Sequence, residues 1–154
     1  MKKKPATTSG DPEFRHPYRT PHLDFWLDGK VTEGGNVTLI LDDKYAEFRV
    51  GCSEFAVLAV LIQEAKSSAP AWMPRGFLTT PQLQQELNKI KTAVINTRRL
   101  ARFIHNIRNL LKKHAERKFG VQDGRQWAFE VLETADRGYR LSIPPKQLRL
   151  ILRK

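Results

Sequence analysis

Apolar and polar residues alternate over short runs in the first third of the chain. Residues 22–27, 36–41 and 45–50 have the composition of strands, and the first run stops at the turn pair Asp28-Gly29. The second and third runs flank Asp42-Asp43-Lys44, a spacing typical of a hairpin. These patterns predict a small antiparallel sheet.

After residue 52 the apolar period changes to that of a helix. Residues 53–68 predict a buried helix with Ser53 as its N-cap, and a segment rich in proline and glycine then interrupts it. A second helix is predicted for residues 79–90, with Thr80 at the cap and Pro81 at the first helical position, where proline is best tolerated. A third helix follows Asn96.

The rest of the chain predicts a hairpin and two terminal tails. Residues 127–143 contain two strand-like runs around a turn at 135–138. Residues 1–21 lack periodicity and predict a flexible basic tail, while residues 146–154 place Leu and Ile at helical spacing among bases. This second tail could dock on the domain or on a second copy. We therefore predict one α+β domain over 22–145: an N-terminal antiparallel sheet, three helices and a C-terminal β-hairpin.

The net charge narrows the classes of partner. The 154-residue chain has 27 Lys and Arg against 16 Asp and Glu, a formal charge of +11, which favours polyanionic partners. Nucleic acid comes first and an acidic membrane surface second. A single cysteine, Cys52, fits a reducing cytoplasm, and no apolar run approaches membrane-spanning length. We expect a cytoplasmic protein, associated with the nucleoid when bound to DNA.

The helix over 96–118 carries most of this charge. Between Lys89 and Lys118 there are ten bases and one acid, Glu116. On a helical wheel the apolar residues fall within one arc, and they are Leu100, Phe103, Ile104, Ile107, Leu111 and Ala115. The opposite arc is basic or amidic. Like charges four residues apart destabilise a helix by ~0.2–0.5 kcal/mol per pair, whereas a face kept for solubility usually mixes signs. A negative partner would offset that cost.

The side chains on this helix favour duplex DNA as the partner. Arg forms paired hydrogen bonds to guanine edges and phosphates, Asn to adenine edges, and Lys contacts mainly phosphates. The candidate DNA-binding residues on this helix are Arg98, Arg99, Arg102, His105, Asn106, Asn109, Lys112 and Lys113. Membrane binding is disfavoured because the apolar arc is needed for packing against the two preceding helices. A plain solvated face remains the alternative.

Three short segments, in order, resemble the winged-helix effector domain of OmpR/PhoB-type response regulators of bacteria. Residues 50–61 are similar to that family's strand-to-helix junction, 98–111 to its recognition helix, and 132–141, which end Gly-Tyr-Arg-Leu, to its closing hairpin. The resemblance covers residues 36–145. It implies a winged helix-turn-helix fold and a sequence-specific, double-stranded DNA-binding transcriptional regulator, with the recognition helix at about 96–118 in the major groove.

The resemblance also implies that the hairpin at 127–143 is a wing near the adjacent minor groove. Arg137 at its turn would enter that groove, where negative potential attracts arginine. An ordinary exposed turn arginine is the alternative. Arg140 alternates with Tyr139 and Leu141, so we expect it to face away from the core and contact phosphate. Thr79 and Thr80 at a helix start can donate to a phosphate, although simple capping explains them equally well.

Two departures from the family pattern concern partners and regulation. The loop at 67–78 is longer than usual, which affects the segment that meets RNA polymerase in some relatives. About 20 residues precede the first strand, too few for a phosphoacceptor receiver domain. RNA polymerase or a regulatory protein as a second partner, and a dimer on DNA, therefore stay open.

No pattern of catalytic residues stands out in the chain. The four histidines, at 16, 22, 105 and 114, do not have the spacing of zinc ligands, and neither a phosphate-binding glycine loop nor a nucleophile elbow occurs. We predict a protein that is not an enzyme, with no cofactor and no metal. The alternatives to DNA binding are a winged-helix protein-interaction adaptor and an RNA-binding module.

Overall fold

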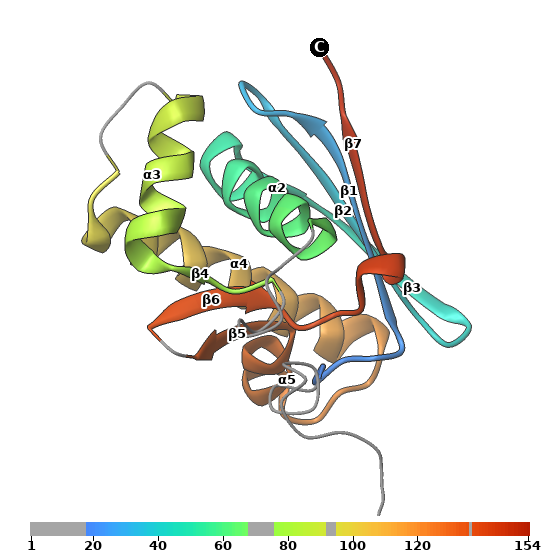
Figure 1. The fold of residues 1–154 in the computed structure, drawn as a ribbon. Helices are drawn as coiled ribbons and strands as arrows, with labels where there is room; N and C mark the ends of the chain where they lie inside the picture. The colour runs from blue at the N-terminus through green and yellow to red at the C-terminus, as the bar shows by residue number, and fades with distance from the viewer. Residues whose placement is uncertain (1–17, 68–75, 92–94, 136) are drawn as a thin grey trace, which may run out of the picture.

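The computed structural model describes residues 18–67, 76–91, 95–135 and 137–154, and within them the chain has an α+β fold. The predicted order of sheet, helices and hairpin is confirmed, with one added helix, α5, and two added strands, β4 and β7 (Figure 1). Residues 1–17 of the predicted tail, and most of the long loop predicted at 67–78, lie outside the described residues. The elements are β1 (Leu23–Lys30), β2 (Gly34–Leu41), β3 (Lys44–Val50), α2 (Cys52–Lys66), β4 (Leu78–Thr79), α3 (Thr80–Lys91), α4 (Thr97–Lys118), α5 (Gly124–Val131), β5 (Leu132–Ala135), β6 (Gly138–Leu141), a 3₁₀ turn (Pro145–Gln147) and β7 (Leu148–Leu152).

The N-terminal sheet has the strand order β3-β2-β1-β7. β2 and β3 form the predicted hairpin: Leu41 pairs with Lys44 across a two-residue turn in which Asp42 has a φ of 57°. The turn predicted at Asp28-Gly29 is wrong, because both residues lie inside β1. A Cβ on Gly29 would lie 2.4 Å from the Gly34 carbonyl oxygen, so the glycine permits close backbone approach there rather than a turn.

The C-terminal segment contributes β7, which pairs in parallel with β1. Of the two docking modes left open, packing on the chain's own sheet is the one observed. The helical spacing predicted for Leu148, Ile151 and Leu152 is wrong. In five residues the helical period of 3.6 and the strand period of 2 cannot be told apart from the apolar positions. The segment is a strand because it pairs with β1.

α2 packs between the sheet and the other helices, as Figure 1 shows. Every residue from Phe55 to Ile62 is buried, because the sheet covers one side of the helix and α3 and α4 approach the others. The N-cap lies two residues earlier than predicted. Gly51, not Ser53, is the N-cap residue, and its carbonyl oxygen accepts from the Phe55 N–H at 2.8 Å.

α4 lies across the far side of α2 and contacts β3, α2 and α5. The predicted apolar arc is confirmed: Leu100, Phe103, Ile104, Ile107, Leu111 and Ala115 are all buried. Asn96 is the N-cap as predicted, and its side-chain oxygen accepts from the Arg99 N–H at 2.8 Å.

Replacing Asn96 by alanine is expected to destabilise the folded protein by about 1 kcal/mol, because one donor in the first turn of α4 loses its partner. Urea unfolding followed by circular dichroism would measure this loss. Asn96→Asp retains an acceptor at the same place and should leave the midpoint within error. If both variants lose equal stability, the cap contact is not the cause.

The C-terminal hairpin is shorter than predicted. β5 and β6 pair from Leu132–Leu141 to Ala135–Gly138, and the expected strand before them, from residue 127, is the helix α5. Asp123 caps α5 by accepting from the Gln126 N–H at 3.0 Å. Trp, Phe and Val favour a strand locally. The segment is a helix instead, because this conformation buries Ala128 and Val131 on one side and packs closely on α4.

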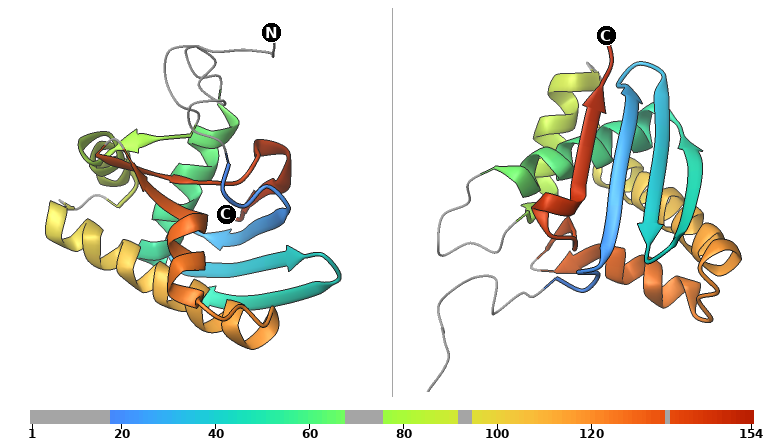
Figure 2. Two further views of the ribbon diagram at one scale, coloured as in Figure 1. Left: turned by 90° about the horizontal axis from the view of Figure 1, so that it is seen from below. Right: turned by 90° about the vertical axis from the view of Figure 1, so that its right-hand side faces the viewer.

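β4 joins the hairpin to the helices. Although only two residues long, it pairs with β6, so the second sheet has the order β4-β6-β5. Figure 2 shows that the outer face of the N-terminal sheet is uncovered by any element that the structure describes. The hairpin is thereby fixed relative to the start of α3.

Candidate nucleic-acid interface

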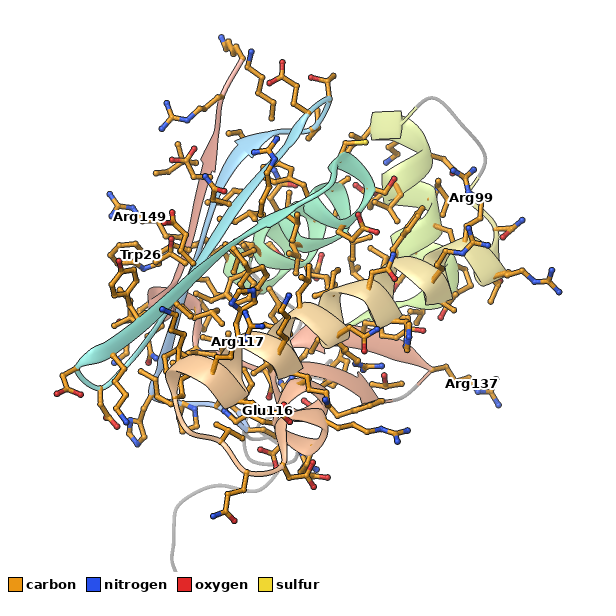
Figure 3. The ribbon with its side chains drawn as sticks, turned by 180° about the vertical axis from the view of Figure 1, so that it is seen from behind. Trp26, Arg99, Glu116, Arg117, Arg137 and Arg149 are labelled. Atoms are coloured by element: carbon orange, nitrogen blue, oxygen red, sulfur yellow. The ribbon has the colours of Figure 1, made fainter. Side chains whose placement is uncertain are left out.

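Five of the predicted side chains form one exposed stripe along α4. We call this stripe the basic face; it consists of Arg98, Arg102, His105, Asn109 and Lys113, all exposed. Their positions follow from the wheel, since burying Leu100, Ile107 and Leu111 turns these residues to solvent. α4 lies in front in Figure 3, with its outer side uncovered by other elements that the structure describes. At 1.5 Å per residue the basic face is about 22 Å long.

The charges of the basic face are not neutralised within the described parts of the chain. No ion pair there involves Arg98, Arg102 or Lys113. The contact within the face is between Asn109 Nδ2 and His105 Nε2, at 3.0 Å. Unpaired like charges on one helix face repel one another, so the face is electrostatically suited to a polyanion.

Three other predicted residues on α4 lie beside the basic face. Asn106 donates to Glu54 Oε2 of α2 at 3.1 Å, so its amide is engaged within the fold. The Lys112 ammonium lies 3.6 Å from Glu116, which relieves part of the repulsion that the sequence implied. Arg99 is exposed, and its guanidinium carbon lies 5.9 Å from the centre of the Phe103 ring.

Arg140 is buried, contrary to the prediction that it faces outward. Its side chain is 1% exposed, and its Nε donates to Glu133 Oε1 at 2.9 Å. The guanidinium also lies over the rings of Phe77 and Tyr18, at 4.6 and 4.9 Å. The alternation of side chains along β6 predicted an exposed Arg140, and this was wrong because β6 is covered on both faces. An interior arginine held by a carboxylate does not contact phosphate.

Residues 18–20, predicted to belong to the tail, supply the second cover of β6. The Thr20 hydroxyl donates to the Ser142 carbonyl at 2.7 Å, and the Arg19 N–H donates to the Ser142 hydroxyl at 2.8 Å. Arg19 also reaches Glu133, with 3.3 Å between Nε and Oε2. These contacts explain why a side chain at position 140 has no route to solvent.

Thr79 and Thr80 have structural roles at the start of α3. The Thr80 N–H and hydroxyl both donate to the Arg137 carbonyl oxygen, at 3.1 and 3.2 Å. Thr79 exchanges hydrogen bonds with Gln82, its hydroxyl accepting from the Gln82 N–H at 3.3 Å and its N–H donating to Oε1 at 2.9 Å. The Thr79 hydroxyl therefore caps α3, and the Thr80 hydroxyl attaches the hairpin to it.

Arg137 is exposed at the hairpin turn, in the left-handed conformation with a φ of 63°. Its carbonyl is held by Thr80, while its side chain projects from the molecule. In Figure 3 it lies on the same side of the molecule as Arg99, which belongs to the first turn of α4, while Arg117 lies toward the other end of that helix. The hairpin turn and the N-terminal end of α4 thus lie toward the same edge of the molecule.

Arg108 also lies on α4, but it was not among the predicted DNA-binding residues. Its Nε and Nη2 donate to the Leu132 carbonyl at 3.0 and 2.5 Å, and Nη2 also donates to Thr134 Oγ1 at 2.6 Å. Its guanidinium carbon lies 4.0 Å from the centre of the Phe129 ring. Burial lowers the pKa of Arg108. Its place on the wheel, next to the apolar arc, is the signal that could have marked it as half-buried.

Arg125 was also missed, because its segment was not expected to form a helix. It is exposed on α5 and borders a groove shared with α4. His114, at the other end of α4, is structural: its ring stacks on Phe48 with centroids 4.6 Å apart. Burial lowers its pKa, and the neighbouring charges of Lys113, Arg117 and Lys118 add to this effect, so the ring is mainly neutral at pH 7.

The described residues contain no group of three or more His, Cys, Asp or Glu side chains close enough to hold a metal ion. None of the helices in that part of the chain is both long and apolar enough to cross a membrane.

Comparison with known proteins adds no assignment. No protein-family model matches the chain, and neither a curated protein nor a solved structure matches it significantly.

Proposed function

We propose that the chain is a winged helix-turn-helix protein that binds double-stranded DNA sequence-specifically and regulates transcription. The observation that carries the proposal is the basic face of α4, exposed and without a carboxylate partner in the described residues. A helix of this kind matches the width of a major groove, and its side chains match the edges of bases.

The arrangement of elements supports the winged-helix part of the proposal. α3 and α4 follow one another across a short connection, as the two helices of a helix-turn-helix do, and the second helix carries the exposed basic residues. The hairpin β5-β6 is bound to β4 and to Thr80 at the start of α3, so its turn has a defined position. In this proposal the hairpin is the wing and Arg137 approaches the adjacent minor groove.

The side chains then divide by chemistry. Arg98 and Arg102 are placed to contact guanine or phosphate, Asn109 to read adenine after releasing His105, and Lys113 to contact phosphate. Arg99 and Lys112 flank the basic face as electrostatic support. Arg140, Thr79 and Thr80 have no part in it.

A selection from random duplex DNA tests sequence specificity directly. Enrichment of one sequence motif is the expected result. If heparin competes as well as the enriched duplex, or structured RNA of equal charge binds better, the DNA proposal is wrong.

Arg102→Ala is expected to weaken binding to the enriched site by ~1–3 kcal/mol, while scrambled duplex loses less. The reason is that a paired hydrogen bond to a base edge is lost only where the cognate base is present. Fluorescence anisotropy with both duplexes would measure the two losses. Equal losses would reduce Arg102 to a phosphate contact.

A further inference from the structure

A groove of about 460 Å³ runs between α4 and α5, beside the hairpin. We call it the α4–α5 groove. Its apolar surface comes from Ile104 of α4, Ala128 and Phe129 of α5, and Tyr139 of β6. Ile104 and Ala128 are buried, whereas Phe129 is 43% exposed, so an aromatic ring stands open to solvent at the groove. The exposed face of such a ring is a flat apolar surface on which another ring can stack.

The same groove carries three cations, and none of the residues that line it is acidic. They are Arg108, Lys112 and Arg125. Glu116 lies 3.6 Å from Lys112 on the next turn of α4, so the local excess is about two positive charges. Arg125 forms no ion pair within the described residues.

Arg108 is held as a fixed donor at this site. Its Nε and Nη2 are occupied by the Leu132 carbonyl and the Thr134 hydroxyl, and the Phe129 ring covers one face of its guanidinium. Nη1 has no hydrogen-bond partner among the described residues. A guanidinium immobilised in this way loses little further entropy when it binds an anion.

We propose that the α4–α5 groove binds a small planar aromatic anion, with its ring against Phe129 and Ile104 and its acid group toward Arg108 Nη1, Lys112 and Arg125. The volume lies in the range of about 300–1,000 Å³ found for small-molecule sites. A phosphate of the DNA backbone would use the cations but not the apolar surface, which is why an organic anion fits better. The two requirements, charge and planarity, define the ligand class.

The position of the groove has a consequence that rests on the proposed function. His105, Asn109 and Lys112 line the groove and are also candidate DNA contacts. A ligand bound there would lie at the edge of the surface that meets DNA, and the two would compete. The existence of the ligand site does not depend on this consequence, and it can be measured without DNA.

The test titrates the full chain, without DNA, with 2-naphthoate as probe and follows binding by ligand-observed NMR. The neutral isostere 2-naphthalenemethanol and inorganic phosphate are titrated in parallel. We expect naphthoate to bind at least tenfold more tightly than either. Equal binding of the alcohol, binding of phosphate as tight as that of naphthoate, or no binding of naphthoate would overturn the proposal.

Variants locate the site. Phe129→Ala and Lys112→Gln are each expected to weaken naphthoate binding about tenfold. Lys113→Gln is the matched control, since Lys113 is the next residue of α4, carries the same charge and lies outside the groove. An equal loss in Lys113→Gln would mean unspecific charge attraction and would overturn the assignment. Circular dichroism of each variant confirms that α4 and α5 remain folded, as expected for exposed positions.

Discussion

Duplex DNA affinity is expected to fall about 500-fold when salt is raised from ~50 to ~200 mM, the effect of about five neutralised phosphates at ~0.9 counterions each. The exposed cations of the basic face and its flanks supply contacts of this number. Because duplex DNA holds condensed counterions, each cation that replaces one makes binding depend on salt. Anisotropy titrations on one duplex at several salt concentrations give the slope of log affinity against log salt, expected near −4 to −5.

The source of the slope can be located with a triple variant. Changing Arg98, Arg102 and Lys113 to glutamine should reduce the slope by about three. A control triple variant removes equal charge from exposed lysines elsewhere on the chain, and these are Lys44, Lys146 and Lys154. The control should reduce the slope by less than one. A similar reduction in both triple variants would show that net charge, and not the basic face, governs binding.

Replacing Glu133 by alanine is expected to destabilise the fold by about 3 kcal/mol, because the interior guanidinium of Arg140 loses the carboxylate that accepts from its Nε. Arg140 is 1% exposed, and Glu133, whose side chain is 12% exposed, accepts from its Nε at 2.9 Å. The guanidinium would remain between Phe77 and Tyr18 without the Glu133 carboxylate. Thermal unfolding should show a melting temperature lower by about 6–12 °C for a chain of this size.

Two comparisons isolate the charge effect. Glu130→Ala removes a nearby carboxylate that accepts from Gln126 at 3.1 Å, and it should cost well under 1 kcal/mol. Exchanging both Glu133 and Arg140 for leucine and methionine should recover much of the stability, since buried pairs are often replaceable by apolar residues of similar size. Equal losses in Glu133→Ala and Glu130→Ala would show that the Glu133–Arg140 pair does not hold the hairpin.

The candidate site was predictable from sequence where a long periodic element controls it. α4 has 22 residues, so its apolar arc and the opposite basic face follow from the 3.6-residue period alone. Asn96 likewise carries its own capping chemistry. Asn106 shows the limit of this reasoning, because its contact with Glu54 depends on where α2 begins relative to α4.

Short elements were decided by their surroundings. Residues 124–131 have strand-like composition, yet the Asp123 cap and packing against α4 make them α5, which in turn creates the α4–α5 groove. Five C-terminal residues became β7 only because β1 had a free edge. Arg140 alternates as an outward strand residue should, yet residues 18–20, more than a hundred positions away, cover it.

The sequence by itself determined β1 to β3, the helices α2, α3 and α4, and a cationic face on the longest helix, because period, capping and charge are local properties of the chain. Tertiary structure alone decided which cations stay free, which one is buried with Glu133, and which ones gather around Phe129 in a groove. The physical reason is that burial and ion pairing depend on contacts between segments far apart in the chain, and no local pattern records those contacts.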